Sequence, residues 1–208
     1  MDDNSDEMLA EKNARRAARD QFHIMRSEAL NAYAQLEQHM AIVFDNLLHG
    51  AQTLDSFVVF GSILNTRSRL IMLEKLFQLR PGLEDFKRFF DGLLKEIRKI
   101  ETFRNKLVHW IVLEGSTGGK PFDPERDVFL AEHPNIFAER KLYSIDIARF
   151  WHKTEFFSQL LYQFSLYIKM RHALPGAPEK TPWIEIFQER PTYPPPIGHQ
   201  LDRFHETP

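Results

Sequence analysis

The residues of this chain best suited to chemistry are Arg104 and His109, which lie where a strongly helical stretch ends. At a separation of five positions, the two side chains fall within a turn and a half of each other on a helix. A guanidinium can neutralise charge on a phosphate, and an imidazole can transfer a proton at neutral pH. Cleavage of a phosphodiester requires both groups, so this segment predicts that chemistry.

The helix that must position the pair is expected from about Leu83 to the His109 region. Its apolar stripe recurs at helical spacing and consists of Phe86, Phe89, Phe90, Leu93, Leu94, Ile97, Ile100 and Phe103. On a wheel at ~100° per residue, Arg104 falls on the edge of that stripe, while Asn105 and His109 share the adjoining face. Glu101 precedes Asn105 by one turn and is expected to support the same polar strip.

The looser pattern of an Arg and a His with four to six residues between them has little specificity, because it occurs three times in the chain. The copies are Arg16/His23, Arg104/His109 and Arg126/His133. Requiring Asn directly after Arg makes a chance match roughly twentyfold rarer, and among these copies Arg104 alone is followed by Asn. A structural interpretation stays open, since Arg and His near a helix C-terminus can also interact with the last carbonyls and the helix dipole.

Three further helices are predicted around this segment. Apolar residues recur at helical spacing over residues 22–47, and Gly50 is expected to end that helix as a C-cap. A second helix is expected over about 53–79, with Gly61 in its interior. The last, over about 144–172, has an aromatic core face. Four amphipathic helices predict an all-α fold, an antiparallel four-helix bundle.

The segment between the third and fourth helices, at about residues 111–143, breaks the helical period. Short β-compatible pieces alternate there with Gly and Pro: Ile111–Glu114, Asp127–Ala131 and Arg140–Tyr143. We expect an irregular insert before the last helix, with or without a small β-hairpin.

The ends of the chain differ from the domain between them. Residues 1–18 are a charged N-terminal extension, 19–173 are the helical bundle domain, and 174–208 are a proline-rich tail. The prolines predict an extended tail, which Trp183 and Phe187 can pin to the bundle.

Composition excludes several classes of function. The chain has no Cys, which excludes disulfides, thiolate metal sites and a Cys nucleophile. No Glu-x-x-His pair occurs on a predicted helix, so neither a metal nor a cofactor is expected. A net charge of −2 gives no global positive field, and we expect no sequence-specific DNA binding. Without a long apolar run the chain is expected to avoid membranes and to be cytoplasmic.

With these residues and elements, the chain resembles the HEPN family, small all-α proteins that include many endoribonuclease toxins. The mark of that family is Arg-x(4–6)-His, often written Arg-Asn-x-x-x-His, near the end of a long helix of a four- or five-helix bundle. Arg104, Asn105 and His109 match it position by position. The order of elements is also similar over roughly residues 20 to 172.

The resemblance implies a metal-independent endoribonuclease that acts as a homodimer on RNA, in the role of a toxin or defence effector with an antitoxin or other protein partner. His109 would be the general acid/base, Arg104 would stabilise charge on the scissile phosphate, and Asn105 would orient the phosphate or the imidazole.

Two observations limit what the resemblance implies. Many toxins of one HEPN subgroup carry Tyr two residues after the His, where a partner nucleotidyltransferase modifies them; here that position is Ile111. HEPN-like domains without catalysis also exist. The alternative is therefore a non-catalytic helical-bundle interaction module that binds protein partners.

Overall fold

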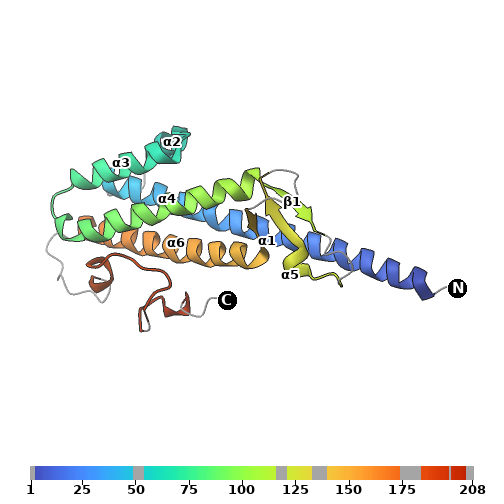
Figure 1. Ribbon diagram of the computed structural model, residues 1–208. Coiled ribbons are helices and arrows are strands. Elements are labelled where there is room, and N and C mark those ends of the chain that lie inside the picture. Colours follow the sequence, from blue (N-terminus) through green and yellow to red (C-terminus); the bar gives the residue numbers. More distant parts are fainter. Residues whose placement is uncertain are drawn as a thin grey trace. The chain divides into compact units, whose positions relative to one another are not determined.

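The computed structural model describes residues 3–48, 54–115, 121–132, 140–173, 184–196 and 198–204. This part of the chain is predominantly helical, as expected, and also contains a small antiparallel sheet (Figure 1). The chain divides into two compact units. The first unit contains Met1–Asn31 and Phe103–Trp151, and the second contains Ala32–Thr102 and His152–Thr207.

Three long helices pass through both units: α1 (Asp3–Leu48), α4 (Lys87–His109) and α6 (Ser144–Ala173). The predicted first helix is confirmed, and it begins earlier than its apolar pattern because the charged extension is helical as well. Gly50, the predicted C-cap, lies outside the described residues. At the start of α6 the Asp146 carboxylate accepts a hydrogen bond from the Tyr143 backbone N–H at 3.0 Å, a capping contact that fixes where the helix begins.

The predicted single helix over 53–79 is wrong, because the chain forms α2 (Leu54–Ser62) and α3 (Thr66–Gln78) instead. The Asn65 side chain accepts a hydrogen bond from the Arg67 N–H at 2.8 Å and so starts a new helix. Arg69 donates to the Ile63 carbonyl at 2.7 Å and takes up an acceptor at the end of α2. Gly61 lies in open space and does not serve a close helix contact.

Aromatic side chains form the centre of the second unit. Phe77 of α3 stacks on Phe90 of α4 with ring centroids 4.3 Å apart. Phe164 of α6 contacts both of these rings and also Phe89, at 5.3 Å. The predicted stripe of α4, which follows a 3-10 turn at Glu84–Phe86, is thus the face that packs against α3 and α6.

The C-terminal segment of the second unit is more compact than the predicted extended tail. It contains two 3-10 turns, η2 (Glu185–Phe187) and η3 (Asp202–Phe204), and lies beside α6 (Figure 1). Phe187 is fully buried, as its predicted pinning role requires, whereas Trp183 lies outside the described residues. A Cβ on Gly92 of α4 would lie 3.0 Å from the Pro191 Cδ, so a larger residue here would require the C-terminal segment to shift by a few tenths of an ångström.

The predicted insert forms a three-stranded antiparallel sheet in the first unit. The strands are β1 (Ile111–Glu114), β2 (Val128–Ala131) and β3 (Lys141–Leu142), in the order β1-β2-β3. Ile111 pairs with Ala131, and Leu130 pairs with Leu142. All four residues of the central strand are buried, and a short helix, α5 (Pro124–Asp127), leads into it. The three β-compatible pieces therefore contain three strands, whereas a hairpin has two.

No helix in the described part of the chain is both long and apolar enough to cross a membrane.

Candidate functional site

The predicted motif occupies the last turn and a half of α4, in the first unit. Leu107 is fully buried and Trp110 is only 8% exposed, so these two side chains fix the rotation of the helix end. The Trp110 N–H donates to the Lys106 carbonyl at 2.9 Å, which extends the helical hydrogen bonding past His109. His109 itself is exposed, as is Val108 beside it. Burial of the apolar neighbours therefore turns the imidazole toward solvent.

Arg104 and Asn105 form a local pair. Arg104 is half-buried, and its Nη1 donates to the Asn105 Oδ1 at 3.1 Å. Phe103, just before, stacks on Phe150 of α6 with centroids 4.9 Å apart, which anchors this turn. Asn105 is exposed and precedes His109 by four residues, so the amide and the imidazole share one face of the helix. Arg104, Asn105 and His109 therefore lie on adjoining parts of one helix end.

Glu101, the expected supporting residue, lies on α4 one turn before Asn105. It is half-buried and belongs to the second unit. Within the described part of the chain, no ion pair involves Glu101.

Arg26 of α1 is a neighbour of the motif that the sequence analysis missed. Its Nη2 donates to the Val108 carbonyl at 3.1 Å, so a cation caps the C-terminal end of α4 where the helix dipole is negative. Burial of Arg26 lowers its pKa from the ordinary value. The sequence left open that His109 caps the last carbonyls of this helix. In the structure, Arg26 makes such a contact. No local pattern announces this contact, because 82 residues separate Arg26 from Val108.

The side chains of Arg104, Asn105 and His109 can bind a phosphate and transfer a proton. An exposed imidazole can exchange a proton with a bound group, and an exposed amide can donate to a phosphate oxygen. The Arg104 guanidinium adds a fixed positive charge next to them. These groups lie on an open helix end. The described residues line one hollow of about 350 Å³ and another of about 690 Å³, and neither is lined by Arg104, Asn105 or His109.

The described residues contain no group of three or more His, Asp and Glu side chains placed to hold a metal ion.

Comparison with protein-family models, curated proteins and solved structures gave no match to this chain. The resemblance to HEPN proteins therefore rests on the motif and on the order of the helices.

Proposed function

We propose that the chain is a HEPN-like, metal-independent endoribonuclease of the cytoplasm that acts as a homodimer, as a toxin or defence effector. In this proposal α1, α3, α4 and α6 correspond to the helices of the family's four-helix bundle. The observation that carries the proposal is the end of α4, where His109 and Asn105 are exposed on one face and Arg104 is held by Asn105.

The proposed reaction is an internal transfer at phosphorus. The 2′-oxygen of the substrate attacks the adjacent phosphorus and loses its proton to an imidazole. The bond from phosphorus to the 5′-oxygen breaks, and that oxygen leaves with a proton. The products are a 2′,3′-cyclic phosphate and a 5′-hydroxyl. His109 moves the proton, and Arg104 stabilises the charge that develops on the phosphoryl oxygens. A homodimer would bring a second His109, so that one imidazole acts as base and the other as acid.

The other Arg/His copy within the described residues provides a matched control. Purified wild type, His109→Ala, Arg104→Ala and the double variant Arg16→Ala/His23→Ala would be incubated with unstructured RNA in EDTA. We expect both α4 variants to lose about 100-fold or more in cleavage rate, and the double variant to retain wild-type cleavage. Equal cleavage by all four proteins, or none by wild type, would overturn the proposal.

A non-catalytic interaction module is the second candidate, and one surface feature favours it. Val58 is 69% exposed, Val59 is 49% exposed, and Leu64 is 95% exposed, so apolar side chains gather at the corner between α2 and α3. Apolar surface of this kind often marks a protein contact. Wild type that folds normally but cleaves no RNA would favour this candidate over the enzyme.

A further inference from the structure

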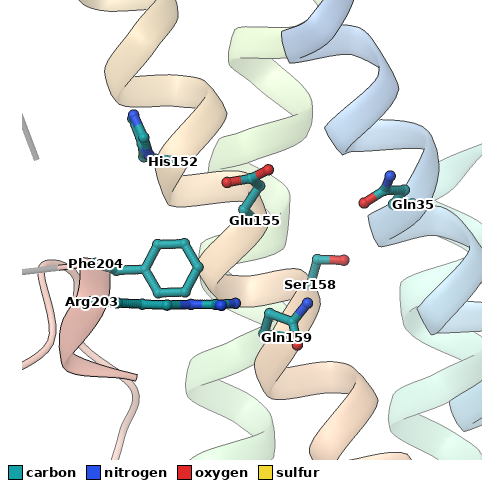
Figure 2. A pocket seen from close by; sticks show the side chains of 7 residues that line it. All are labelled: Gln35, His152, Glu155, Ser158, Gln159, Arg203 and Phe204. Atoms are coloured by element: carbon teal, nitrogen blue, oxygen red, sulfur yellow. The ribbon is translucent and has the colours of Figure 1, made fainter. Parts of the chain in front are cut away.

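A polar cavity in the second unit lies among α1, α6 and η3 (Figure 2). Its volume of about 350 Å³ falls within the range of small-ligand sites. Figure 2 shows Gln35 reaching in from α1, Glu155 and Gln159 from α6, and Arg203 and Phe204 from η3. The cavity exists because the C-terminal segment packs on α6, and it contains none of the motif residues of α4.

Two opposite charges line this cavity without neutralising each other. Within the described part of the chain, neither Glu155 nor Arg203 takes part in an ion pair. A carboxylate can accept two parallel N–H bonds, and a guanidinium can donate two. The cavity therefore offers one two-fold acceptor and one two-fold donor to a ligand.

The position of Arg203 is supported by Phe204. The Arg203 Cζ lies 4.8 Å from the centroid of the Phe204 ring. Phe204 is only 6% exposed and meets the ring of Phe156 edge-on at 5.7 Å, so its position is fixed by packing. The ring therefore holds the Arg203 guanidinium in place, and the N–H groups of that guanidinium donate in its own plane.

A nucleophilic role for Ser158, which also lines the cavity, is disfavoured by its partner. The His39 Nδ1 lies 3.0 Å from the Ser158 carbonyl oxygen and 2.8 Å from its hydroxyl oxygen. In the tautomer that donates from Nδ1 to the carbonyl, Nδ1 cannot take a proton from the hydroxyl.

We propose that this cavity binds a guanine base. Guanine carries two neighbouring N–H donors on its Watson–Crick edge, which match the Glu155 carboxylate, and two acceptors, O6 and N7, which match a guanidinium such as Arg203. Adenine lacks the paired donors. The amides of Gln35 and Gln159 can satisfy the remaining polar atoms. The base can come from a free guanine nucleotide or from single-stranded RNA, and the inference stands without the ribonuclease proposal.

Calorimetric titration of the full chain with GMP and with AMP tests the inference. The variants are Glu155→Gln and Arg203→Gln, with Glu185→Gln and Arg67→Gln as exposed, charge-matched controls. We expect GMP to bind at least about tenfold more tightly than AMP, and each cavity variant to lose about tenfold or more in affinity for GMP. Both controls should bind as wild type does, and circular dichroism should show that every variant is folded.

The source of the base is resolved by competition. A 2′-O-methyl oligoadenylate with one guanosine would be titrated against bound GMP. Displacement supports guanine recognition within a strand, and GMP binding without displacement supports recognition of the free nucleotide. The inference is overturned if GMP does not bind, if AMP binds equally well, or if both cavity variants keep wild-type affinity. RNA cleavage does not enter this test, so its failure and that of the ribonuclease proposal are distinguishable.

Discussion

Replacing Phe187 with alanine tests whether the C-terminal segment is an integral part of the second unit. Phe187 is fully buried, with its ring centroid 5.0 Å from that of Phe89, 5.2 Å from that of Phe164 and 5.8 Å from that of Tyr167. Removing a buried phenylalanine ring costs about 3–5 kcal/mol. If the segment detaches before the helices unfold, the loss is limited to its docking free energy, so we expect about 3 kcal/mol, the lower end.

Urea unfolding followed by circular dichroism measures this loss, and a glutamate-specific protease reports detachment by cleaving after Glu189. We expect a lower free energy of unfolding and faster cleavage in Phe187→Ala. The control Gln188→Ala, at an exposed neighbouring position, should stay within about 0.5 kcal/mol of wild type. The reasoning is refuted if Phe187→Ala matches that control in both measurements.

Three further predictions concern the second unit. Burial raises the pKa of Glu96, but hydrogen bonds from two lysines, including Lys153 at 2.8 Å, lower it by more. The ion pairs thus stabilise the fold above the ordinary carboxyl pKa, so Glu96→Gln should unfold more easily than wild type in urea at neutral pH. This difference should shrink as the pH falls below the ordinary carboxyl pKa and through the lowered one; a constant difference would contradict this. Desolvation lowers the pKa of His39, only partly offset by its bond to the Ser158 carbonyl. Stability should therefore fall as pH drops below the ordinary imidazole pKa, and His39→Asn should flatten that slope; an unchanged slope would argue against it. Asn65→Ala should lose about 1 kcal/mol from the cap of α3 in the same assay, while Asn65→Asp should keep it; equal effects would rule out capping.

The spacing of apolar residues was sufficient to predict an element where only one of its faces is buried. The stripe of α4 could be predicted because each apolar residue at helical spacing has one way to leave water, and Phe89, Phe90 and Leu93 are indeed fully buried. The strands of the insert were also recognisable, since β-branched and aromatic residues there are separated by Gly and Pro. The placement of Arg104, Asn105 and His109 on adjoining parts of a helix end followed from the same geometry.

Contacts between distant side chains and backbone could not be predicted in this way. The break between α2 and α3 had a local signal in the Asn65 cap. The pairing of Arg69 with Glu37 of α1 at 2.8 Å had none. The capping of α4 depends on Arg26, and the packing of the C-terminal segment depends on the glycine at position 92. Each of the last three is a tertiary contact that overrides a local propensity, so no pattern within one segment indicates it.

The most direct test of the account is the chemistry of the ends that the protein produces on RNA. Wild type and His109→Ala would be incubated in EDTA with a defined RNA and with a copy that carries one 2′-deoxynucleotide at the preferred cleavage site. The account predicts 2′,3′-cyclic phosphate and 5′-hydroxyl ends from wild type, no cleavage at the deoxy position, and a loss of about 100-fold or more in His109→Ala. Absence of cleavage by wild type, cleavage at the deoxy position, or full activity in His109→Ala would contradict it.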